Sequence, residues 1–114
     1  MPSHARSHLV VRVADRANAD LDSALREALP FIASALRQPG GRVLVHCEAG
    51  ASRSGSAVTA SVVAFPQLLG VSPMGVDAAL AFVKAQRPAV RPNYGFLEKL
   101  RAKAWLDTSP WSEY

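Results

Sequence analysis

The sequence of 114 residues predicts a single α/β domain in which helices flank a parallel sheet. Three observations support this fold class. A β-branched, apolar run at residues 42–46 is typical of a buried strand. A loop of small residues then leads into a helix rich in alanine and valine. A second β-branched run, residues 9–14, precedes a long segment whose apolar residues recur at helical spacing.

Composition and charge indicate a folded, intracellular protein. Hydrophobic residues make up 49% of the chain, which favours a packed globule over disorder. The net charge of +4 is spread along the chain, so it suits an acidic, phosphorylated ligand better than nucleic acid. A single cysteine excludes an internal disulfide and fits a reducing compartment. No apolar run has the roughly 20 residues of a membrane span, so we expect a soluble protein of the cytoplasm or nucleus.

The first helix is expected at residues 21–37, where apolar residues follow a helical period. Asp20 is its predicted N-cap, and Pro30 is expected to kink it or break its hydrogen-bond ladder. The turn signal at residues 39–41 ends it and leads into the strand at 42–46. Before the first strand, residues 1–8 are polar and are expected to fray.

Three further helices are expected after the loop. The first runs from Ser54 to about Leu69 and should be disturbed near its end by Pro66. The second is expected to begin at Ser72–Pro73 and to end near residues 87–88. The last is capped by residues 91–93. Its predicted buried side consists of Phe96, Leu97, Leu100 and Ala104. Packing, not binding, is the predicted role of Trp105 and Trp111.

The loop after residues 42–46 has the chemistry of a phosphate cradle. Its N–H groups and the start of the helix converge on one point, where the helix dipole adds positive charge. Cys47 lies there, and a cysteine at a helix N-terminus beside a cation ionises well below the ordinary pKa of about 8.5. Arg53 offers a planar fork of donors for two phosphoryl oxygens. The Ser54 hydroxyl is within reach of the sulfur, and His46 is expected to orient the loop rather than act as a base. The alternative is a buried, inert cysteine.

This pattern resembles the signature of the cysteine-dependent protein tyrosine phosphatases. It consists of His46, Cys47, Gly50, Arg53 and Ser54. The surrounding residues 41–54 are most similar to the dual-specificity branch. The resemblance implies a covalent phosphocysteine intermediate, with no metal or other cofactor. The phosphate-binding loop that it implies comprises Glu48, Ala49, Gly50, Ala51, Ser52 and Arg53.

The resemblance also implies a general acid and a bracing residue. In this family an aspartate just past a strand and before a helix donates a proton to the leaving group, and Asp15 matches that place. Asp20 and Asp22 are rivals, although the first is expected to cap a helix and the second to lie in its first turn. Asp15 could also be an ordinary solvated loop residue. Residues 86–97 resemble a family segment in which an asparagine, here Asn93, is thought to brace the phosphate loop, and a plain N-cap is the compatible alternative.

The function expected from these residues is hydrolysis of phosphotyrosine on a protein substrate, with phosphoserine and phosphothreonine as further candidate substrates. Phosphoinositide phosphatases use a similar loop, but the acidic Glu48 disfavours a highly charged inositol phosphate. Rhodanese-like proteins and arsenate reductases share the cysteine and the arginine, but the flanking segments fit these classes less well. A phosphopeptide-binding pseudophosphatase, or an inactive fragment of a longer phosphatase, is the alternative from another class.

The resemblance covers residues 9–104 and leaves part of the expected sheet unaccounted for. Members of this branch carry a few dozen further residues before the strand at 9–14, and these supply more strands. Residues 42–46 should form a central strand, which needs a neighbour on each side to satisfy its backbone groups. We therefore expect either an N-terminally shortened member that self-associates through an open edge, or a fragment of a longer protein.

Overall fold

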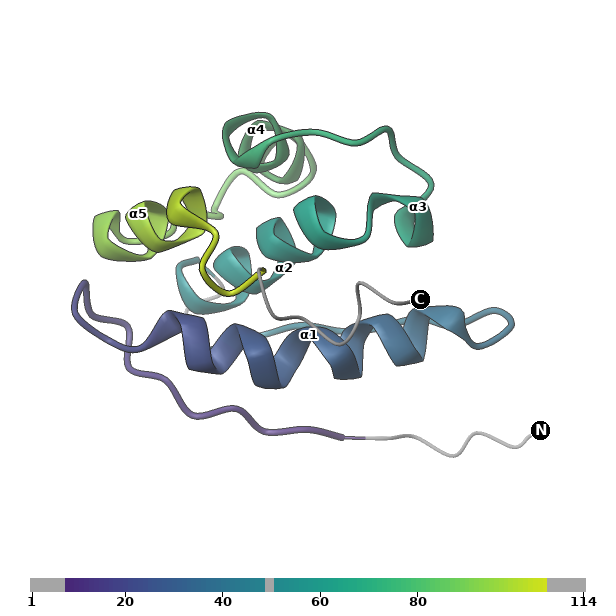
Figure 1. The fold of residues 1–114 in the computed structure, drawn as a ribbon, viewed down its shortest axis with the longest axis horizontal. Helices are drawn as coiled ribbons and strands as arrows, with labels where there is room; N and C mark the ends of the chain where they lie inside the picture. The colour runs from purple at the N-terminus through teal and green to yellow at the C-terminus, as the bar shows by residue number, and fades with distance from the viewer. Residues whose placement is uncertain (1–7, 49–50, 107–114) are drawn as a thin grey trace.

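The structure is a computed structural model that describes residues 8–48 and 51–106. Residues 1–7, predicted to fray, and Trp111, predicted to pack, lie outside these ranges. Five helices follow one another along the described chain (Figure 1). They are α1 (Leu21–Arg37), α2 (Arg53–Ala64), α3 (Pro66–Leu69), α4 (Val76–Gln86) and α5 (Tyr94–Ala102).

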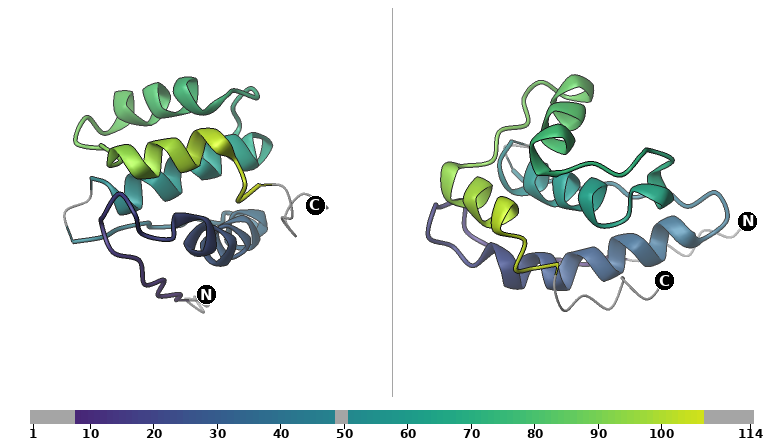
Figure 2. Two further views of the ribbon diagram at one scale, coloured as in Figure 1. Left: turned by 60° about the vertical axis from the view of Figure 1, so that its left-hand side comes forward. Right: turned by 45° about the horizontal axis from the view of Figure 1, so that its top comes forward.

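Helix α2 occupies the centre of the molecule. It lies between α1 and α4, and it also packs against α3 and α5 (Figure 1, Figure 2). Its side chains are small, which lets four neighbours approach its backbone closely. The buried hydroxyls of Ser56 and Thr59 donate to carbonyls one turn earlier, at 2.7 and 2.8 Å, so that they are not left without a partner.

Two apolar clusters hold the helices together. The larger cluster contains side chains from all five helices and from the segment after α5, where the side chain of Trp105 is fully buried. Its buried members are Leu21, Leu25, Leu29, Ile32, Ala33, Ala60, Phe65, Val76, Phe96, Leu100 and Trp105. The smaller cluster joins α2 to α4 and consists of Val62, Ala79, Val83 and Val90. The packing role predicted for Trp105 is therefore confirmed.

Helix α1 has the predicted bounds and the predicted cap. The Asp20 carboxylate accepts hydrogen bonds from the N–H of Ser23 at 3.0 Å and from its hydroxyl at 2.7 Å. The helix continues through Pro30, which has no N–H to donate to the carbonyl one turn earlier. It ends at Arg37, and Gly40 adopts φ +68° in the turn that follows.

The later helices differ from the prediction in three places. Phe65 interrupts the helix expected at 54–69, so that α3 starts with Pro66 as its first residue, as the proline signal indicates. The predicted start at Ser72–Pro73 is wrong, because Gly75 is extended and caps α4, which begins at Val76. Ala104 is exposed and lies beyond α5, because Lys103 adopts φ 60° and ends the helix.

The two predicted strands run as non-helical chain along the helices (Figure 1). Half-buried and exposed side chains alternate along both 9–14 and 42–46, as they do in a strand with one covered face. Val43 and Val45 pack on the main core, whereas the side chain of Leu44 between them is 83% exposed. No residue in the described ranges is part of a β-strand, so the parallel sheet stays a prediction.

The helices are too short or too polar to cross a bilayer. Within the part of the chain that the structure describes, none combines the length and the hydropathy that a membrane-spanning helix requires.

We predict that Asp20→Ala lowers the urea midpoint of unfolding at pH 7. The hydrogen bonds from Ser23 lower the pKa of Asp20 below its ordinary value of 3.8. The stabilisation is therefore present above pH 3.8 and is lost as the pH falls through the lower, folded-state pKa. Asp20→Asn, which can still cap but cannot ionise, is the matched control. Equal midpoints for wild type and Asp20→Ala at pH 7 would contradict the capping role.

Candidate active site

The sulfur of Cys47 lies at the start of α2. The backbone N–H of Ser54 donates to the sulfur at 3.4 Å, and the thiol donates to the Ser54 hydroxyl at 3.3 Å. Ser54 is buried, with 6% of its surface exposed, and its hydroxyl is within the predicted reach of the sulfur. An N–H of the first helical turn directed at sulfur favours the anionic thiolate over the thiol.

The loop between Cys47 and α2 is tied to the segment before α5. The N–H of Arg91 donates to the carbonyl of Ala51 at 2.8 Å. The N–H of Asn93 donates to the hydroxyl of Ser52 at 2.9 Å, and Ser52 is only 5% exposed. The loop therefore rests on residues 91–93 through backbone N–H groups.

Two members of the predicted phosphate-binding loop, Ala49 and Gly50, lie outside the described residues. Glu48, just before them, is exposed. The side chain of His46 is also exposed, and among the described residues it makes no hydrogen bond that would orient the loop.

Asn93 connects the loop that contains Ser52 to Asp15 and to the start of α5. Its side-chain amide donates to a carboxylate oxygen of Asp15 at 2.9 Å, across 78 positions of sequence. Its side-chain oxygen accepts the N–H of Phe96 at 2.9 Å and so caps α5. The capping role is confirmed, and the same side chain holds Asp15.

Of the three candidate aspartates, only Asp15 lies beside the loop. Asp20 caps α1, and a carboxylate oxygen of Asp22 lies 4.0 Å from Lys99 Nζ. Hydrogen bonding to Asn93, then to Ser52, lowers the pKa of Asp15; burial opposes this shift, and the nearby charge of Arg53 makes the smallest contribution, which also lowers the pKa. In this arrangement Asp15 is an ionised carboxylate at neutral pH.

Arg53 is half-buried and reaches toward the segment that ends in Asp15. Its Nη1 donates to the carbonyl of Val13 at 3.5 Å, a long hydrogen bond. Arg53 lines a shallow hollow together with residues 10–14. The guanidinium thus lies on the Asp15 side of the loop.

The links between Asp15, Ser52 and Asn93 have no local signal in the sequence. Each joins residues that are about 40 to 80 positions apart. The family resemblance pointed to Asn93 as a brace of the loop, but not to its contact with Asp15. The buried position of Ser52 could have been suspected only from its place at the N-cap of α2.

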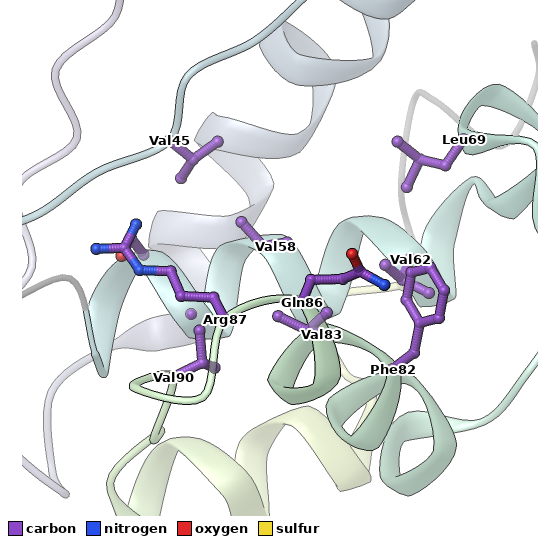
Figure 3. Close-up of a pocket in the computed structure, with 11 residues that line it drawn as sticks. Val45, Val58, Val62, Leu69, Phe82, Val83, Gln86, Arg87 and Val90 are labelled. Atoms are coloured by element: carbon purple, nitrogen blue, oxygen red, sulfur yellow. The ribbon is translucent and has the colours of Figure 1, made fainter.

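An apolar hollow of about 280 Å³ lies between α2 and α4, next to the site, and Ser54 is among the residues that line it (Figure 3). Val58 and Val62 line it from α2, Phe82 and Val83 line it from α4, and Val45 borders it from the 42–46 segment. Its apolar lining suits side chains rather than a phosphate. Within the described ranges, no group of three or more His, Cys, Asp or Glu side chains is placed to hold a metal ion.

Comparison with known proteins identifies the family. The family described as "Dual specificity phosphatase, catalytic domain" matches residues 2–104. Human dual specificity protein phosphatase 1 is 35% identical over 102 residues, which are 87% of this chain and 26% of that protein. Dual specificity protein phosphatase 1 of Arabidopsis thaliana is 41% identical over 92 residues, which are 81% of this chain and 43% of that protein. The chain therefore belongs to the dual specificity phosphatase family.

Solved structures show the same fold. The Yvh1 phosphatase domain from Chaetomium thermophilum matches with a TM-score of 0.71 and 34% identity, over 84% of this chain and 64% of that one. Human DUSP28 matches with a TM-score of 0.68 and 28% identity, over 82% of this chain and 57% of that one. The described helices of this chain are thus arranged as in these phosphatases, and the chain spans less than two thirds of each of them.

Proposed function

We propose that this domain hydrolyses phosphate monoesters on proteins, phosphotyrosine first and phosphoserine or phosphothreonine as well. The observation that carries the proposal is the Cys47 sulfur at the start of α2, held by the N–H and the hydroxyl of Ser54. A reduced thiolate suits a reducing compartment, which favours the cytoplasm or nucleus as the proposed location.

The proposed reaction has two steps. The Cys47 thiolate attacks phosphorus, a sulfur–phosphorus bond forms, and the bond to the leaving oxygen breaks. Asp15 gives its proton to that oxygen, and Arg53 with the loop N–H groups binds the phosphoryl oxygens. Water then attacks the phosphocysteine, Asp15 takes a proton from it, and phosphate and free thiolate are released.

Asp15 must be protonated when the substrate reacts, although it is ionised in the empty site. A phosphate dianion that enters beside Asp15 disfavours a second negative charge, so it raises the pKa of this carboxyl. The shift has to overcome the hydrogen bonds from Asn93 and Ser52 that lower it. The lowered pKa of Asp15 also supports a second candidate function. If phosphate does not raise this pKa enough for Asp15 to carry a proton, the domain binds phosphopeptides without turning them over.

We also propose that residues 9–14 and 42–46 belong to a parallel sheet that other residues complete. Alternating exposure along both segments and the 83% exposed Leu44 support this. The apolar hollow beside Val45 adds uncovered surface next to the 42–46 segment. We propose that a second copy of the chain supplies the residues that complete this sheet and cover its exposed side chains.

Substitution of the nucleophile should separate chemistry from binding. Cys47→Ser is expected to abolish hydrolysis of 4-nitrophenyl phosphate while phosphate still binds, because the loop N–H groups and Arg53 remain. Arg53→Ala should weaken both, and Arg53→Lys should not restore them, because a point charge cannot contact two oxygens in one plane. Steady-state kinetics and isothermal titration with inorganic phosphate measure the two effects. Turnover that survives in Cys47→Ser would refute the mechanism.

Replacement of the general acid should depend on the leaving group. Asp15→Asn is expected to slow phosphotyrosine peptides about 10²- to 10⁴-fold, and to slow esters with very acidic leaving groups much less. The variant should also lose the basic limb of the pH–rate profile. Asp20→Asn is the control and should leave the leaving-group dependence unchanged. The assignment is wrong if Asp20→Asn or Asp22→Asn shows the predicted pattern and Asp15→Asn does not.

Self-association should depend on Leu44. Light scattering of the wild type is expected to give a mass above that of the monomer at high concentration, and Leu44→Lys should shift it toward the monomer. Tyr94→Lys, which changes another apolar side chain that is 73% exposed, is the matched control and should not. A wild type that is monomeric at all concentrations and unfolds cooperatively would show that no second copy is needed.

A further inference from the structure

At Gly95 the backbone of helix α5 contacts the backbone of residues 15–17, the segment that carries Asp15. Gly95 is the second residue of α5 and is buried. A Cβ at this position would overlap the carbonyl oxygen of Ala17 and would lie 2.6 Å from its carbonyl carbon. Because the neighbouring atoms belong to the main chain, they cannot turn aside as the end of a side chain can. The loop and the helix can meet this closely only if residue 95 has no side chain.

The contact at Gly95 and the hydrogen bond from Asn93 hold the same short segment. Asn93 binds the Asp15 carboxylate, and Gly95 admits the backbone of Ala17 two positions further on. The N–H of Asn93 also binds the Ser52 hydroxyl in the loop that carries Cys47. The first turn of α5 is thus the common support of Asp15 and of the phosphate loop.

We propose that Gly95 is a positioning residue for Asp15. Because Gly95 has no side chain, the 15–17 segment can lie against α5, and this contact sets how close the segment lies to the phosphate loop. The proposal rests on the proposed phosphatase function, in which Asp15 is the proton donor. A proton donor must lie within hydrogen-bond reach of the leaving oxygen, and a displacement of about 1 Å can cost about 100-fold in rate.

Other glycines supply the comparison. A Cβ at Gly75, the N-cap of α4, would have no atom within 4 Å, and neither Gly75 nor Gly95 has positive φ. At Gly55 the nearest atom, 2.6 Å away, is a methyl carbon of the Val90 side chain, which can move. Alanine has a higher helix propensity than glycine, so a loss in Gly95→Ala cannot come from a weaker helix.

The test compares Gly95→Ala with Gly75→Ala on two esters. For Gly95→Ala we expect kcat/KM on phenyl phosphate, whose leaving group needs a proton, to fall about 10- to 100-fold. On 4-nitrophenyl phosphate it should fall by less than about 3-fold, because that leaving group needs little protonation. Inhibition by orthovanadate should be unchanged, and Gly75→Ala should match the wild type on both esters.

A double variant and a second substitution test the assignment to Asp15. In the Asp15→Asn background, Gly95→Ala should cause no further loss on phenyl phosphate, because the group that it displaces is already gone. Asn93→Ser removes the amide donor to Asp15 and still caps α5, so it should give the same dependence on the leaving group. Equal losses on both esters, a further loss in the double variant, or a Gly95→Ala chain that does not fold would each overturn the proposal.

A readout without turnover separates this proposal from the proposed function. If the wild type hydrolyses neither ester, the phosphatase proposal fails, but the carboxyl of Asp15 can still be titrated by NMR. Displacement of Asp15 from Asn93 should then raise its pKa in Gly95→Ala toward the ordinary value of 3.8, and Gly75→Ala should leave it unchanged. An Asp15 pKa that is the same in Gly95→Ala and wild type would overturn the positioning role.

Discussion

The close packing of four helices around α2 is the constraint on which the rest of the structure depends. Only small side chains allow such an approach, and in this helix many of them are serine, threonine or alanine. Buried hydroxyls need partners, and those of Ser56, Thr59 and Ser61 find them in carbonyls one turn back along the same helix. Helix α2 is therefore packed against four other helices, and its first turn presents the N–H and hydroxyl of Ser54 to the Cys47 sulfur.

The groups of the candidate site come from three distant segments that meet at the first turn of α5. Asn93 contributes an N–H to Ser52, an amide to Asp15 and an oxygen to its own helix. Because one residue contacts both the Asp15 carboxylate and the Ser52 hydroxyl, a small movement of α5 would shift the two together. The same contacts lower the pKa of Asp15 and so favour its carboxylate form.

Local signals in the sequence predicted local features well. The cap at Asp20 and the apolar period gave the bounds of α1, and Pro66 marked the break before α3. The start of α4 was missed because a plausible Ser-Pro cap lies three residues before Gly75, whose extended backbone decides the boundary. The β-branched, apolar runs at 9–14 and 42–46 indicated strands, but a strand also requires a paired neighbour, which local pattern cannot supply. The contacts of Gly95 with Ala17 and of Asn93 with Asp15 span 78 positions each and were likewise beyond reach of any local pattern.

The covalent intermediate on Cys47 is the central claim, and rapid acid quenching followed by mass spectrometry tests it most directly. The full chain is mixed with 4-nitrophenyl phosphate, quenched within the first turnover, and digested. The account predicts one added phosphoryl group on the peptide that contains Cys47, which decays as free phosphate appears. A phosphoryl group on another residue, or steady turnover with none on Cys47 at any time, would contradict it.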